Sequence, residues 1–106
     1  MNYLELGDLP MRELAPGCPA RIVHSQFMTF VHWYFNAGSV IPGHAHPHEQ
    51  VATMIEGELE LTVGGETRLI GPGAVVIIPP NAPHSAKALT PCYVIDAFYP
   101  IREDYR

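Results

Sequence analysis

Basic residues are scarce in this chain, and charge of either sign is low. Six Lys and Arg stand against eleven Asp and Glu, so the formal net charge is −5 and charged residues make up 16% of the sequence. Proteins that bind the phosphates of nucleic acid need clustered cations, so this balance argues against a nucleic-acid partner. No apolar run approaches the about 20 residues of a membrane-spanning helix, which argues against a membrane partner.

Cysteines are few, and a targeting signal is missing. Cys18 and Cys92 are the only two cysteines, and neither belongs to a Cys-x-x-Cys pair. Two isolated thiols predict reduced, structural residues. Residues 1–8 are acidic and lack the charged and then apolar pattern of a signal peptide, so we expect a cytoplasmic protein.

Helical periodicity is absent too, because apolar residues do not recur at helical spacing over three turns. Short apolar runs instead alternate with turn residues, among them eleven Pro and nine Gly. Eight strands within about 80 residues predict a single all-β domain, with the jelly-roll barrel as the leading architecture. The predicted strands are Arg21–His24, Met28–Phe35, Gln50–Ile55, Glu58–Val63, Glu66–Ile70, Ala74–Ile78, His84–Ala88 and Cys92–Tyr99.

Turn residues divide the chain further. Three prolines and a glycine within residues 1–19 predict an extended N-terminal arm, followed by the barrel domain over residues 20–106. Gly64–Gly65 is a two-residue hairpin signal, and we expect Glu56–Gly57 to join its two strands in the same way.

Three of the six histidines lie in one pentapeptide, at His44, His46 and His48. Residues two apart on a strand point the same way, so His44 and His46 are expected to converge. Gln50 follows four residues after His46, and His84 comes directly after a proline-rich, rigid stretch. Three imidazoles and one amide oxygen would form a metal site with open positions, as catalytic sites have. A polar loop that is merely rich in histidine remains the alternative.

The other histidines receive different interpretations. His48 shares the parity of the pair, but Pro47 can bend the strand before it, so we expect it beside the site and not as a ligand. His24 and His32 lie on early strands among aromatic residues and are interpreted as packing or surface residues.

The last predicted strand carries a carboxylate on an otherwise apolar face. If that face points into the barrel, Asp96 is buried, its pKa rises, and it can move protons. Phe98 lies on the same face and would offer a flat wall to a sugar ring. Arg102 follows Pro100, and its planar guanidinium matches a carboxylate. A solvated Asp96 and a surface Arg102 are the alternatives.

Two spacings resemble the two motifs of the cupin family. Gly38, His44, His46, Gln50 and Gly57 stand as in the first motif. Gly73, Pro79, Asn81 and His84 stand as in the second. Gln50 replaces the Glu of most cupins, and Asn81 and Ala88 replace the usual Gly and Asn. Asn81 can still adopt the left-handed backbone that a Gly would use.

The chain most closely resembles the KdgF-type cupins of pectin and alginate breakdown. Its sequence is similar to theirs at residues 46–50, at 78–81 and in the tail at 100–105. The resemblance implies ketonisation of 4,5-unsaturated monouronates, with a small acidic sugar as substrate and a homodimer as the assembly. It also implies four metal ligands, His44, His46, Gln50 and His84. Asp96, Phe98 and Arg102 would be the further active-site residues, with Asp96 and Arg102 catalytic and Phe98 and Arg102 contacting the substrate.

An amide ligand has an electrostatic consequence. Because His and Gln are neutral, a divalent ion would keep both charges, which favours an anionic substrate. Neutral ligands also hold metal less tightly, so nickel, zinc, iron and manganese are all candidates for the one ion. Two other functions remain: an iron-dependent oxygenase, which Gln50 argues against, and a non-catalytic sugar-binding cupin.

Overall fold

Alternating apolar and polar residues build ten strands in the computed structural model, which describes all 106 residues. The strands are β1 (Arg12–Ala15), β2 (Cys18–His24), β3 (Thr29–Phe35), β4 (Val40–His44), β5 (Glu49–Glu56), β6 (Leu59–Val63), β7 (Glu66–Ile70), β8 (Val75–Ile78), β9 (His84–Ala88) and β10 (Cys92–Tyr99). Two short 3₁₀ turns, η1 (Leu6–Asp8) and η2 (Glu103–Tyr105), complete the chain. Neither turn has the length or the apolar character needed to cross a membrane.

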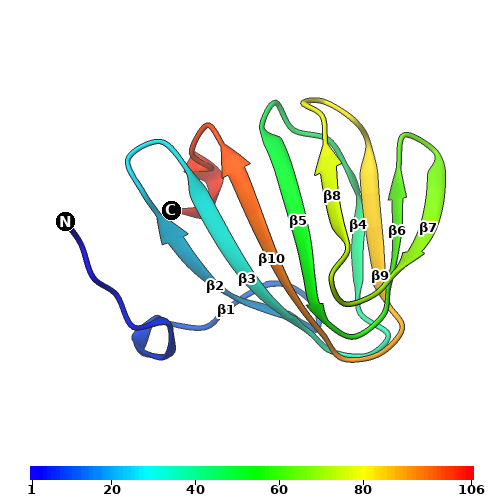
Figure 1. The fold of residues 1–106 in the computed structure, drawn as a ribbon, viewed down its shortest axis with the longest axis horizontal. Coiled ribbons are helices and arrows are strands. Elements are labelled where there is room, and N and C mark those ends of the chain that lie inside the picture. Colours follow the sequence, from blue (N-terminus) through cyan, green and yellow to red (C-terminus); the bar gives the residue numbers. More distant parts are fainter.

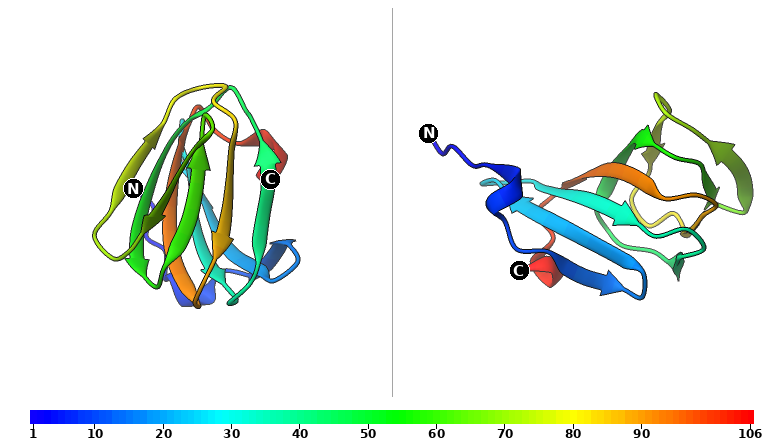
Figure 2. Two further views of the ribbon diagram at one scale, coloured as in Figure 1. Left: turned by 90° about the vertical axis from the view of Figure 1, so that its right-hand side faces the viewer. Right: turned by 90° about the horizontal axis from the view of Figure 1, so that it is seen from below.

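The strands form two antiparallel sheets that pack face to face (Figures 1 and 2). The larger sheet has the order β1-β2-β3-β10-β5-β8, and the smaller has the order β4-β9-β6-β7. All eight predicted strands are present. The all-β, jelly-roll prediction is therefore confirmed.

The N-terminal segment differs from the expected arm. Residues 12–15 form β1, which pairs with the start of β2, so only residues 1–11 lie outside the sheet. Figure 2 shows the chain start projecting from the body. The prolines did not exclude a strand here because Pro10 and Pro16 lie on either side of β1, and Pro19 lies near the start of β2. Gly17, at φ +74°, makes the tight turn between β1 and β2.

The prediction of one of the two hairpins is also wrong. Gly64–Gly65 joins the paired strands β6 and β7, as predicted. Glu56–Gly57 instead joins β5 and β6, which belong to different sheets. Gly57 has φ +91°, and a Cβ there would lie 2.2 Å from the carbonyl oxygen of Pro91. Its role is therefore to let the chain cross closely from one sheet to the other.

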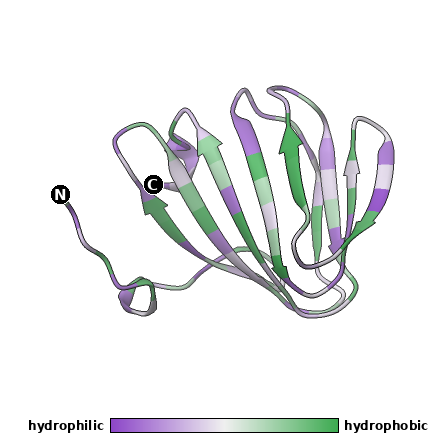
Figure 3. Cartoon of the chain, viewed as in Figure 1, coloured by the Kyte–Doolittle hydropathy of each residue, from purple (hydrophilic) through white to green (hydrophobic).

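The core lies between the sheets and is built by inward-facing alternate residues of the strands. Figure 3 shows hydrophobic residues along most of the strands. In β10, Cys92, Val94, Asp96 and Phe98 are all buried, which confirms the predicted inward face. Both cysteines are free and buried, as expected. The interior face of β10 thus places one carboxylate deep in the sandwich.

Candidate metal centre and active site

Three histidines meet at one end of the space between the sheets. His44 ends β4 and His84 begins β9, and the two residues are register partners. His46 lies in the loop after β4, and one ring nitrogen from each histidine lies within 4.8 Å of the others. The expected convergence is therefore present, but strand parity is not its cause. The chain leaves the strand after His44, and the loop backbone turns His46 back toward the other two rings.

Backbone carbonyls fix the proton on each of these rings. Nδ1 of His44 donates to Pro42 O at 2.9 Å, Nδ1 of His84 to Ala82 O at 2.9 Å, and Nδ1 of His46 to His48 O at 3.1 Å. A carbonyl can only accept, so Nδ1 carries the proton and Nε2 carries a lone pair. Metal-binding histidines in proteins are commonly oriented by such a bond from their other ring nitrogen.

The Nε2 atoms of His84 and His46 have no hydrogen-bond donor beside them. Nε2 of His84 is buried and has no hydrogen-bond partner. Nε2 of His46 lies 3.1 Å from Oε1 of Gln50, so two acceptor atoms face each other. Burial, followed by the charge of Arg102, lowers the pKa of His46 to about 4, and burial also lowers the pKa of His84. Protons therefore do not fill these positions at neutral pH, and the donor set suits a cation.

Asp96 lies on the inward face of β10 and is 6% exposed. Trp33 Nε1 donates to its Oδ2 at 2.8 Å, whereas Oδ1 is buried without a partner. Burial raises the pKa of Asp96 to about 6, against the opposing effect of the Trp33 hydrogen bond. The free oxygen can therefore take and return a proton near neutral pH.

Arg102 is buried, not at the surface, with 5% exposure. Its guanidinium carbon lies 4.7 Å from the ring centre of Phe98 and 4.1 Å from that of Tyr105. Asp104 accepts from Nε at 2.9 Å and from NH2 at 2.7 Å, so one edge of the planar group is already used. Only the NH1 end is left without a partner, and it is buried. An anion would therefore meet the NH1 end of Arg102.

These groups line one cavity of about 290 Å³. Gln50, His44, His84, Asp96, Phe98 and Arg102 all contribute, and apolar residues such as Trp33 and Leu61 form the remaining walls. All of the expected active-site residues except His46 thus line a single space, with His46 packed beside it against His84 and Phe98.

The other histidines lie outside the cluster. His48 is half-buried and bonds through Nε2 to Ile101 O at 3.3 Å. His24 contacts Thr29 and Tyr105, and His32 stacks on Tyr93.

Sequence reasoning missed Trp33, Asp104 and Tyr105. Trp33 was hidden among the apolar residues of a strand. The short tail after Pro100 has no periodicity that could orient its side chains. Asn81, in the loop before His84, has φ +66°, as its substitution for Gly predicts.

Comparison with known proteins places the chain among related sequences and structures. A family model described as a cupin domain matches residues 31–98. The pectin degradation protein KdgF of Dickeya dadantii is 30% identical over 98% of this chain and 97% of its own length. The structure of KdgF from Halomonas sp. has 29% identity and a TM-score of 0.93, covering 100% of this chain and 99% of that one. An RmlC-like cupin from Shewanella frigidimarina has 26% identity and a TM-score of 0.94, covering 100% and 96%.

Proposed function

We propose that this chain, which belongs to the cupin domain family, uses a bound divalent metal ion to open and ketonise 4,5-unsaturated monouronates. The observation that carries the proposal is the set of three imidazoles that each donate from Nδ1 to a backbone carbonyl and lie together beside a buried carboxylate. The two KdgF relatives, one of which is described as a pectin degradation protein, support the substrate class.

The metal would be held by His44, His46, His84 and Gln50. All four ligands are neutral, and nickel, zinc, iron and manganese each accept imidazole nitrogen and carbonyl oxygen. When bound, a divalent cation supplies a positive charge that stabilises negative charge developing on the sugar's ring oxygen.

The chain's own residues supply binding and proton transfer. Arg102 would hold the substrate carboxylate through its NH1 end, and Phe98 would support the ring. Oδ1 of Asp96 would take the proton of the anomeric hydroxyl as the bond between the anomeric carbon and the ring oxygen breaks. The same carboxyl would then return that proton to carbon 4 of the resulting enolate, giving the linear keto-uronate. Atoms and electrons balance without an oxidant or reductant, since the product is an isomer of the substrate.

The direct test is an assay on unsaturated galacturonate. Metal-loaded protein is expected to accelerate loss of the conjugated ultraviolet band well beyond the spontaneous rate. No acceleration with any of the four metals would contradict the proposal. Uptake of oxygen with ferrous iron would favour an oxygenase, and sugar binding without turnover would favour a non-catalytic binding protein.

Gln50→Glu tests the charge of the site. A carboxylate ligand cancels one charge of the cation, so metal affinity should be at least that of wild type while kcat falls on the order of tenfold. The measurements are metal titration and the ultraviolet assay. Gln26→Glu, the same change at an exposed loop residue, is the control and should alter neither. Faster turnover in Gln50→Glu would contradict the charge argument.

We also propose that the chain forms a homodimer through the outer face of the larger sheet. Over β3, β10, β5 and β8, two neighbouring cross-strand rows on that face contain no charged residue. They are Phe30, Ala97, Val51 and Ile77, and then His32, Ile95, Thr53 and Val75. The corresponding face of the smaller sheet instead pairs Lys87 with Glu60 and Ser85 with Thr62. An antiparallel sheet with a solvated face is normally polar on that face, so the larger sheet is expected to be covered.

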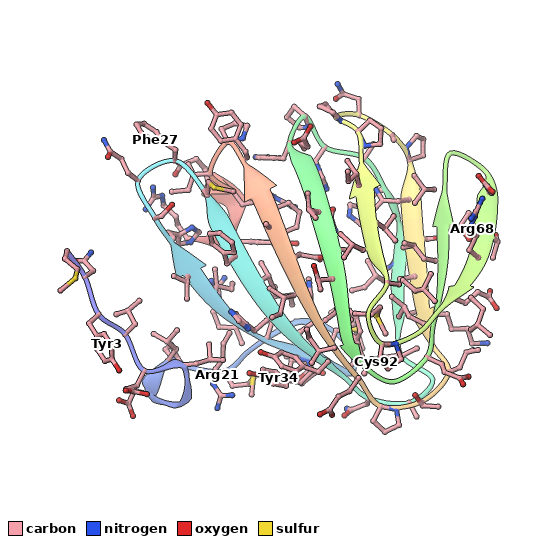
Figure 4. The ribbon with its side chains drawn as sticks, viewed as in Figure 1. Tyr3, Arg21, Phe27, Tyr34, Arg68 and Cys92 are labelled. Carbon is pink, nitrogen blue, oxygen red and sulfur yellow. The ribbon has the colours of Figure 1, made fainter.

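A second copy suits this face because it would present the same neutral rows, and no charge would lose its water. Arg21 stands next to the second row on β2, where it is the register partner of His32, and its guanidinium lies over the ring of Tyr34 at the lower edge in Figure 4. Light scattering should give twice the chain mass at micromolar concentration, and Ile95→Glu should reduce it to the chain mass. Leu69→Glu, on an exposed position of β7, should stay dimeric. A monomeric wild type would contradict this interface.

A further inference from the structure

The short tail after β10, which carries Arg102 and Tyr105, is held by a chain of hydrogen bonds from β2 and β3. The backbone N–H of Arg102 donates to Oγ1 of Thr29 at 2.8 Å. Oγ1 of Thr29 lies 2.9 Å from Nδ1 of His24, and Nε2 of His24 lies 3.3 Å from the carbonyl oxygen of Tyr105. The same carbonyl accepts from NH1 of Arg12 at 2.5 Å. Both ends of the turn are therefore bonded to the larger sheet.

We call the chain from the N–H of Arg102 through Thr29 and His24 to the carbonyl of Tyr105 the relay. The groups at its two ends determine which atoms donate and which accept. The carbonyl of Tyr105 only accepts, so Nε2 of His24 carries the proton and Nδ1 is an acceptor. The hydroxyl of Thr29 must then donate to His24 while it accepts from the N–H of Arg102. Thr29 has 0% exposure, so no water replaces either bond. With a neutral imidazole at His24, this arrangement satisfies every polar group in the relay.

The relay matters because Thr29 alone bonds the backbone of Arg102 to the larger sheet; the carbonyl of Arg102 accepts from the N–H of Tyr105, within the same turn. Its side chain is 7% exposed and is held by Asp104, whose side chain is 57% exposed. An ion pair to such an open partner contributes only about 1 kcal/mol at most. The stacked ring of Tyr105 belongs to the same turn and moves with it.

We propose that Thr29 and His24 are positioning residues, which hold the turn of residues 102–105 so that the NH1 end of Arg102 faces the cavity. Neither residue lines the cavity, and both act through the turn that carries Arg102 and Tyr105. The substrate role of Arg102 in this proposal rests on the proposed function. The positioning of the turn rests on the hydrogen bonds of the relay.

The test compares Thr29→Val with Thr29→Ser. Valine keeps the shape and removes the hydroxyl, whereas serine keeps the hydroxyl. Because Arg102 would bind the substrate carboxylate equally before and during the reaction, Thr29→Val should raise KM about tenfold with kcat changed less than about twofold. Thr29→Ser should restore the wild-type KM. Thr67→Val, which removes a hydroxyl on β7 far from the cavity, is the control.

A second readout is independent of activity. The Nε–H of Arg102 is buried against Asp104, so its proton should exchange slowly with water in the NMR spectrum. Thr29→Val should speed this exchange about tenfold or more, while leaving metal content unchanged. His24→Leu, at a half-buried site, tests the other half of the relay should Thr29→Val fail to fold.

Unchanged exchange and unchanged KM in folded Thr29→Val or His24→Leu would overturn the inference. A wild type with no turnover would overturn the proposed function instead, and the exchange measurement would still decide the role of the relay.

Discussion

Asp96→Asn is expected to lower kcat by about 10²–10⁴-fold while leaving the metal content at the wild-type level. Asparagine can still accept the bond from Trp33 Nε1, so the local packing is kept. It has no oxygen that can take and return a proton, which is the role assigned to Oδ1. Initial rates with unsaturated galacturonate and metal analysis of the same sample measure the two effects. A variant that keeps most of its turnover would contradict the assignment.

The same substitution should make the metal-free protein more stable. Burial raises the pKa of Asp96 from its ordinary value of 3.8 to about 6 in the folded chain, so ionisation opposes folding above pH 6. Stability linked to this group therefore rises as the pH falls from about 6 toward 4, and asparagine removes the penalty at neutral pH. The gain in the free energy of unfolding is up to about 3 kcal/mol at pH 7.5. Asp8→Asn, at an exposed position, is the matched control in urea unfolding and should change nothing. A lower free energy of unfolding in Asp96→Asn would contradict this prediction and show that the carboxylate stabilises the fold.

His84→Ala is expected to lower metal affinity by at least about 100-fold and to remove turnover at ordinary metal concentrations. Nε2 of His84 is buried and unpartnered, so a metal ligand is the role that explains its orientation toward His44 and His46. Titration with nickel or zinc, followed by calorimetry, gives the affinity. His32→Ala also loses one imidazole, but from the outer face of β3, and should bind metal as the wild type does. Equal affinity in the two variants would contradict the site.

Two-residue alternation and pairs of turn residues in the sequence were sufficient to predict much of this fold. Alternation in residues 92–99 placed Asp96 and Phe98 inside, and the glycine pair after Val63 located a hairpin. His46 came to the right place for another reason, because the direction of a loop side chain depends on backbone angles that alternation does not encode. β1 was missed because the prolines on either side of it favoured an extended arm.

The surroundings of Arg102 could not be deduced from the sequence. Asp104 and Tyr105 act through a turn that is oriented by Thr29 and His24, more than 70 residues away along the chain. Thr29 looks like any β-branched strand residue in the sequence. Such contacts depend on how two distant strands lie side by side, which local spacing does not determine.

The most direct test of the central claim is anomalous diffraction from crystals grown with nickel. A single peak is expected among the Nε2 atoms of His44, His46 and His84, with Oε1 of Gln50 as a further ligand. A loaded protein whose peak lies elsewhere, or whose metal is bound by only one of the three imidazoles, would contradict it.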